Sequence, residues 1–216
     1  GAGRSIFLPL RVIACGWEEM AMSAAEPIKP VTHLTAEPGK AELQQIGNSD
    51  IAAMQLPPGR FHVITAWPDS LDQCSKALSR LGLGVPEKVG DAIVTAEGSA
   101  MRVAPGRWFF DGLDPGPAAD GSEKFVITDL SNGMAMFKIH GEKATRLAQK
   151  LIMVDLSGDR PAPPVVMQTG SSHGIGLTML WSERNQFKLF CEKSYERDFW
   201  HMLQAELAEF TIDETA

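Results

Sequence analysis

Cysteine and histidine are scarce in this sequence, which holds three cysteines and five histidines in 216 residues. Cys15, Cys74 and Cys191 lie far apart and show no CxxC spacing, which argues against a disulfide framework and against a zinc site. The histidines form no HxH or HxxxH pair, so the sequence predicts no metal site. Free thiols fit a reducing compartment, and we therefore expect a cytoplasmic protein.

Basic clusters and long apolar runs are also missing. The 20 lysines and arginines occur singly or in pairs, and with 27 acidic residues the formal net charge is −7. Binding to a nucleic-acid backbone normally needs a clustered basic surface, so we expect no nucleic-acid partner. No apolar run reaches the length that a bilayer-spanning helix needs, so we expect no membrane partner.

The first 59 residues show little hydrophobic periodicity. We interpret residues 1–22 as a tag remnant or an over-extended reading frame, with Met20 or Met22 as the natural start. Residues 23–59 contain five prolines, which indicates an extended N-terminal arm. We therefore expect 1–59 to lie outside the fold and a single folded domain to cover residues 60–212.

Two similarly built stretches make up that domain. In the first, residues 60–66 alternate as a strand, and Asp69 and Ser70 are suitable N-caps for a helix that ends at Gly82. Three short strands are predicted after this helix, at residues 92–96, 100–104 and 107–111.

The second stretch repeats this order. Strands at residues 125–130 and 135–140 are predicted to form a hairpin, because Asn132-Gly133 favours a tight turn. A helix over residues 142–152 follows, with Ala144, Leu147, Ala148 and Leu151 on its buried face. The remaining elements are strands at residues 165–169, 176–182 and 186–192, and a closing helix whose apolar stripe of Phe199, Met202, Leu203 and Phe210 we assign to the core.

This order of elements predicts an α+β fold made of duplicated halves, each with a helix and antiparallel strands. The two pseudo-repeats cover about residues 60–113 and 122–212, and a loop rich in proline and glycine at residues 114–121 separates them.

Several short motifs between about residues 75 and 210 resemble the gamma subunit of heterotetrameric sarcosine oxidase. None of them is specific alone, but they occur in the same order. They are Arg80-Leu-Gly-Leu-Gly-Val-Pro86, Ala104-Pro-Gly-Arg-Trp-Phe-Phe110, Thr128-Asp-Leu-Ser-Asn-Gly133, Ile139-His-Gly-Glu-Lys-Ala144, Val154-Asp-Leu156, Gln168-Thr169 and Glu192-Lys-Ser-Tyr195, followed by Phe199-Trp200.

The resemblance implies a fold related to the folate-binding domain of the glycine-cleavage T-protein, and a role in sarcosine catabolism by a bacterial oxidoreductase complex. It implies partner subunits named alpha, beta and delta, which carry NAD, tetrahydrofolate, FAD, a shared FMN and zinc. It also implies that the gamma-type chain holds no cofactor and supplies no catalytic residue. On this reading the isolated chain exposes an apolar patch, which self-association into a homo-oligomer could cover.

The sequence departs from that family in its long lead-in and at Met134, Met136 and Leu151-Ile152-Met153. Two alternatives therefore stay open. One is the small subunit of a methylglutamate-dehydrogenase-type complex. The other is a stand-alone folate-binding one-carbon protein of the aminomethyltransferase type, although the additional C-terminal domain of that family is missing from this sequence.

Few residues are candidates for chemistry. Asp129, Asp155 and Asp159 could act as acid or base groups, but capping of turns and backbone hydrogen bonding explain the first two. Ser171-Ser172-His173 brings a hydroxyl and an imidazole together without a GxSxG frame. The glycine-rich segment 170–176 lacks the GxGxxG order, so we interpret it as a loop.

The best candidates for recognition are Arg107 and Trp108, because arginine and tryptophan anchor protein interfaces more often than other residues do. The alternative for Trp108 is a core position at the start of a strand. The sequence thus predicts a speculative partner contact at Arg107 and Trp108, with no catalytic, cofactor-binding or metal-binding residues.

Overall fold

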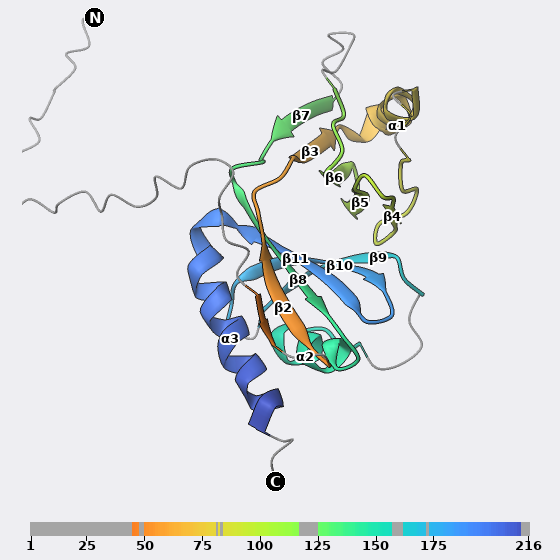
Figure 1. Ribbon diagram of the computed structural model, residues 1–216. Coiled ribbons are helices and arrows are strands. Elements are labelled where there is room, and N and C mark those ends of the chain that lie inside the picture. Colours follow the sequence, from red (N-terminus) through yellow and green to blue (C-terminus); the bar gives the residue numbers. More distant parts are fainter. Residues whose placement is uncertain are drawn as a thin grey trace, which may run out of the picture. The chain divides into compact units, whose positions relative to one another are not determined.

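Two antiparallel sheets and three α-helices form the described part of the chain in the computed structural model (Figure 1). The structure describes residues 45–47, 50–80, 82, 84–116, 125–156, 162–171 and 173–212. No helix among these residues is both long and apolar enough to cross a membrane. The α+β class expected from the sequence is therefore confirmed.

One sheet, which we call sheet B, contains five strands in the order β4-β5-β6-β3-β7. A short 3-10 turn, Pro68–Ser70, leads from β3 into helix α1, Leu71–Arg80. The strands are β3 (Phe61–Ala66), β4 (Ala92–Val94), β5 (Ser99–Ala104), β6 (Arg107–Asp111) and β7 (Phe125–Asp129).

The second sheet, sheet A, contains six strands in the order β1-β2-β8-β11-β10-β9. Helix α2 (Ala144–Leu151) follows β8, and helix α3 (Glu196–Ile212) follows β11 after a 3-10 turn. The strands are β1 (Gln45–Gly47), β2 (Ala52–Leu56), β8 (Met134–His140), β9 (Val165–Gly170), β10 (Gly176–Glu183) and β11 (Gln186–Glu192).

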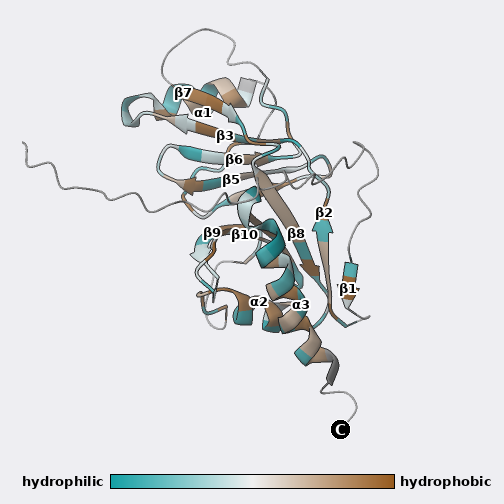
Figure 2. Ribbon diagram, turned by 90° about the vertical axis from the view of Figure 1, so that its left-hand side faces the viewer, coloured by the Kyte–Doolittle hydropathy of each residue, from teal (hydrophilic) through white to brown (hydrophobic). Residues whose placement is uncertain are grey.

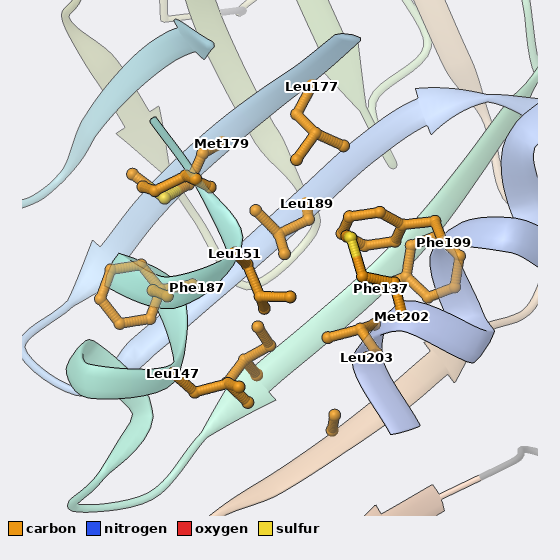
Figure 3. Close-up of a cluster of buried hydrophobic side chains, with 14 of the residues drawn as sticks. Phe137, Leu147, Leu151, Leu177, Met179, Phe187, Leu189, Phe199, Met202 and Leu203 are labelled. Carbon is orange, nitrogen blue, oxygen red and sulfur yellow. The ribbon is translucent and has the colours of Figure 1, made fainter. Parts of the chain in front are cut away.

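Three apolar clusters show that both faces of each sheet are covered. The first packs sheet A against α2 and α3, and its interdigitated side chains are drawn in Figure 3. The second lies between the sheets and joins Phe61 and Phe109 of sheet B to Leu180 and Phe190 of sheet A. The third packs the other face of sheet B against α1. The order of layers is therefore α1, sheet B, sheet A, and α2 with α3 (Figure 2).

Burial on both faces explains why the central strands are nearly continuously apolar. In β11, Phe187, Leu189 and Cys191 point to the helices, whereas Phe190 points to sheet B. Successive side chains of a strand alternate between the two faces, so a strand covered on both sides needs apolar residues at most positions. The sequence analysis predicted these strands but not that both of their faces are covered.

The two sheets repeat one topology, but each also contains strands that come from outside its own unit. The order strand, helix and three strands holds for β3-α1-β4-β5-β6 and again for β8-α2-β9-β10-β11. Strand β2 precedes the first of these units in sequence yet pairs with β8, and β7 precedes the second unit yet pairs with β3. The two units are therefore interlocked, because β1 and β2 extend sheet A beyond β8 and β7 forms the edge of sheet B beside β3.

Sheet A begins earlier in the chain than the sequence suggested. The lack of periodicity before Arg60 leads to the expectation of an extended arm, whereas β1 and β2 lie in the sheet, and Ile51, Ala52 and Ala53 are buried. Pro57 and Pro58 follow β2 directly, where the chain leaves sheet A for sheet B. Residues 1–44 lie outside the described residues.

The prediction of a hairpin at Asn132-Gly133 is wrong. A turn is present, with the amide of Gly133 donating to the carbonyl of Leu130 at 2.8 Å, but β7 and β8 diverge into different sheets. Gly133 does not have the positive φ of a primed hairpin turn. A dipeptide preference thus marked a turn correctly but could not fix which strands pair after it.

The other helices and strands occur where the sequence places them, within a few residues. Ala144, Leu147, Ala148 and Leu151 are buried as predicted, and so is the apolar stripe of α3. Figure 3 shows Leu147 and Leu151 from α2 and Phe199 and Leu203 from α3 directed at the same face of sheet A.

Candidate functional site

Two cavities open at the boundary between the sheets. The larger, of about 570 Å³, we call the Arg107 cavity; the smaller, of about 410 Å³, we call the Lys188 cavity. The Arg107 cavity is lined by Arg107, Phe109, Leu130, Gly133, Met134, Gln168, Thr169, Gly176, Leu177, Thr178, Phe190, Cys191, Glu192, Lys193 and Ser194. The Lys188 cavity is lined by Leu56, residues 94–99, Asp111, Gly112, Lys138, Leu180, Ser182, Glu183 and residues 186–188.

The internal repeat relates these two cavities to each other. The Arg107 cavity meets the start of β6 and the end of β11, and the Lys188 cavity meets the start of β11 and the end of β6. The β5–β6 and β10–β11 hairpins each turn through two residues. In both turns the carbonyl oxygen of the second residue accepts a hydrogen bond from a backbone amide. Gly106 accepts from Ala66, and Asn185 accepts from Gly141. Matching the turns makes Phe109 equivalent to Lys188, and Asp111 equivalent to Phe190.

In the Lys188 cavity an ion pair joins the two sheets. Lys188 Nζ of sheet A lies 2.6 Å from Asp111 Oδ2 of sheet B. The Asp111 side chain is only 7% exposed, and the Ser99 hydroxyl donates a second, longer bond to the same oxygen at 3.4 Å. Lys138 stands directly opposite Lys188 in the β8–β11 ladder, so the carboxylate also offsets the repulsion between two lysines. These contacts give the pair a structural role.

In the Arg107 cavity aromatic rings occupy the equivalent positions. Phe61 lies between Phe109 and Phe190, with ring centroids 5.3 Å from each. The exposed guanidinium of Arg107 lies 5.5 Å from the centroid of the Phe109 ring. The cavity therefore combines an aromatic floor with a cation at its rim.

The structure separates the two residues predicted to contact a partner. Trp108 is fully buried under α1, and its indole Nε1 donates to the carbonyl oxygen of Pro86 at 3.3 Å. The Arg102 guanidinium lies 5.0 Å from its ring. Trp108 thus offers no surface to a second protein. Arg107 and Trp108 differ in exposure because neighbouring residues of a strand point to opposite faces. Arg107 remains exposed, on the face directed towards sheet A.

The two candidate acid or base groups that the structure describes, Asp129 and Asp155, lie in different parts of the fold. Asp129 accepts the Ser131 amide at 2.8 Å and the Ser131 hydroxyl at 2.5 Å, and these bonds lower the pKa of the Asp129 carboxyl. The Ser131 hydroxyl in turn accepts the Phe61 amide at 3.0 Å, which ties the turn to β3. Asp155 is exposed after α2, and Asp159 lies outside the described residues.

The serine and histidine of the glycine-rich segment form a turn. The buried Ser171 hydroxyl accepts the amides of His173 and Ile175, at 3.2 and 2.9 Å. Gly174 has φ +81°, a left-handed conformation that glycine adopts without strain. These bonds support interpretation of this segment as a loop; Ser172 lies outside the described residues.

No group of three or more metal-ligating side chains occurs in the described part of the chain. Cys74 and Cys191 are buried in different outer cores, and desolvation raises the pKa of their thiols to about 11 and about 12. Buried thiols with raised pKa values are poor nucleophiles at neutral pH.

Sequence reasoning missed both cavities and the Asp111–Lys188 pair. A signal for the pair does exist, since Asp111 ends the buried run Trp108-Phe109-Phe110 and Lys188 interrupts the apolar run of β11. A charge inside a buried strand needs a partner, but the sequence does not identify that partner.

Comparison with known proteins gives structural matches only. No protein-family model and no curated protein sequence matches this chain. A chain in the structure of heterotetrameric sarcosine oxidase from Corynebacterium sp. U-96, in complex with pyrrole 2-carboxylate, matches with a TM-score of 0.66 and 18% identity. The match covers 76% of this chain and 87% of that chain. Glycine cleavage system aminomethyltransferase T from Bartonella henselae matches with a TM-score of 0.45 and 12% identity, over 69% of this chain and 44% of that chain.

At 18% identity the first match shows that the two chains share a fold. The structure described above therefore has the architecture of a chain found in a heterotetrameric sarcosine oxidase.

Proposed function

We propose that this chain is a non-catalytic, gamma-type subunit of a heterotetrameric, flavin-dependent oxidase that demethylates sarcosine. In this proposal the alpha, beta and delta subunits hold NAD, tetrahydrofolate, FAD, FMN and zinc, and this chain holds none of them. Its contribution to the complex is contact area and shape.

The observation that carries the proposal is agreement between the ordered motifs and the matched structure. The motifs lie between about residues 80 and 200, within the folded part of the chain. Moreover, 76% of 216 residues is about 164 residues, so 87% coverage makes the matched chain about 190 residues long. A length of about 190 residues supports the proposal, because the resemblance implies a small subunit.

Exposed side chains at one end of sheet B have the composition of a protein interface. Val126 is 51% exposed and Trp67 is 53% exposed. Val126 and Arg107 both pair with Thr65, on opposite sides of β3, and Trp67 follows β3 directly. Tryptophan and arginine are enriched among residues that dominate binding energy, which favours this end of sheet B as the contact with a larger subunit.

The direct test is affinity purification of the tagged chain from cells that also produce candidate large subunits. We expect flavin-containing large subunits to be recovered with it in fixed stoichiometry and to oxidise sarcosine. Recovery of the chain alone, or turnover by the chain alone, would contradict the proposal. Preference of the complex for an N-methylglutamate substrate would instead favour the methylglutamate-dehydrogenase type.

A matched pair of variants tests the contact surface. Val126→Asp places a charge in the proposed interface, whereas Val94→Asp places one on an exposed valine, 44% accessible, at the opposite edge of the same sheet. We expect the first variant to reduce recovery of the large subunits at least tenfold and the second to leave it unchanged. Calorimetric titration with tetrahydrofolate tests the stand-alone alternative, because saturable micromolar binding by the single chain would support it.

A further inference from the structure

The Arg107 cavity is open partly because β10 lacks a side chain there. Gly176 occupies a position of β10 that faces sheet B, on the same face as Thr178 and Leu180, while Leu177 and Met179 face the helices. A Cβ atom at Gly176 would have no heavy atom within 4 Å, and its φ lies outside the left-handed region. The space therefore exists without any backbone requirement for glycine.

The chemistry of the two equivalent cavities differs. In the Lys188 cavity, lysine and aspartate from opposite sheets meet and satisfy each other. In the Arg107 cavity the equivalents of this lysine and this aspartate are Phe109 and Phe190, respectively. The cation at the rim, Arg107, forms no ion pair within the described residues. The other cation of the lining, Lys193, pairs with Glu196, so Arg107 is the cation of this lining that remains for an anion.

From this we propose that the Arg107 cavity binds a small carboxylate with an apolar, ring-sized body. The body would lie over Phe109 and Phe190, and the carboxylate would accept hydrogen bonds from the Arg107 guanidinium. A guanidinium matches the geometry of a carboxylate and remains charged at every accessible pH. The volume of about 570 Å³ lies within the range of about 300–1,000 Å³ found for small-molecule sites.

The proposal goes beyond the proposed function, in which the chain acts through its partners. It concerns the isolated chain, so it can fail or hold whether or not the chain joins a complex. The test uses 3-phenylpropionate as probe, with 3-phenylpropanamide and 3-phenylpropylamine as neutral and cationic controls of similar size.

Binding is measured by amide chemical shifts and saturation-transfer NMR on the full chain. For a probe of this size we expect millimolar affinity, with shifts centred on Phe109, Thr169 and Gly176. The neutral and cationic probes should bind at least about fivefold more weakly. Equal binding of all three probes would overturn the role of Arg107, and no binding of 3-phenylpropionate at saturating millimolar concentration would overturn the site.

Two variants locate the site, and a third controls for charge. Arg107→Gln should weaken 3-phenylpropionate binding about tenfold, and Gly176→Phe should abolish it by filling the cavity. Arg184→Gln removes the same charge from the exposed β10–β11 turn and should leave affinity unchanged. Should Gly176→Phe bind the probe like the unaltered chain while retaining its native spectrum, the ligand lies elsewhere and the proposal is wrong.

Discussion

Five strands of sheet A have the same order as the five strands of sheet B, but the outer cores of the two sheets are very different. Sheet A is covered by α2 and α3, and its outer core includes five aromatic side chains, among them Phe137 and Phe199. Sheet B is covered by the ten-residue helix α1, and its outer core is built around Trp108 and Phe110. The cluster between the sheets is common to both. One topology can therefore tolerate unequal outer layers, because the exchanged strands and the shared inner core make the halves stabilise each other.

The largest effect should come from removing β1 and β2, the two strands of sheet A that precede the first unit. A variant beginning at Arg60 lacks β1 and β2, which leaves β8 as an edge and removes the buried residues Ile51, Ala52 and Ala53. We expect loss of the cooperative folded state, measured by circular dichroism and thermal denaturation. A variant beginning at Ala41 is the control and should unfold like the full chain. If the Arg60 variant folds with unchanged stability, the interlocked arrangement is wrong.

Large-to-small substitutions compare the outer cores directly. Phe137 is fully buried, with its ring 4.9 Å from that of Phe199 and 6.2 Å from that of Trp200. Phe137→Ala should lower the free energy of unfolding by about 3–5 kcal/mol, and Leu78→Ala, beneath α1, by about 2–3 kcal/mol. Urea denaturation gives both values. A larger loss for Leu78→Ala would show that the small outer core contributes more than its size suggests.

Removal of the inter-sheet ion pair should have a smaller effect. Lys188→Met leaves the nearly buried Asp111 carboxylate with the Ser99 hydroxyl as its weaker partner, so we expect a loss of about 2 kcal/mol. The double variant Lys188→Met/Asp111→Leu should recover most of this loss, because no charge then remains buried. Additive effects in the double-mutant cycle would mean that the pair does not couple the sheets.

The smallest expected effect on stability comes from the two buried cysteines at high pH. One lies in each outer core, so they allow the two cores to be compared. Burial raises the pKa of Cys74 to about 11 and the pKa of Cys191 to about 12, from the ordinary thiol value of 9.0. The folded state favours the protonated thiol, so this contribution to stability is complete below pH 9. It declines as the pH rises from 9 through 11 for Cys74, and from 9 through 12 for Cys191.

The pH-dependent part of the stability that each thiol causes should be absent from the corresponding variant, Cys74→Ala or Cys191→Ala. Denaturation between pH 8 and pH 10.5 measures this. Alkylation in the native state should also reach Cys74 at lower pH than Cys191. Equal reactivity of the two thiols would indicate that the outer cores protect them equally.

Local patterns were sufficient for most elements of the fold. The face of α2 and the stripe of α3 could be read from the sequence because helical periodicity places those residues together without reference to the rest of the chain. The pairing after Asn132-Gly133 could not be read, because a turn preference does not specify whether the following strand joins the same sheet.

The sequence by itself determined the α+β class and the repeated order of helix and strands. Only the tertiary structure decided that β2 and β7 exchange sheets, that Trp108 is buried while Arg107 stays exposed, and that Asp111 meets Lys188 across 77 positions of chain. The physical reason is that periodicity reports which face a residue occupies, whereas pairing between sheets depends on contacts between residues that are remote in sequence.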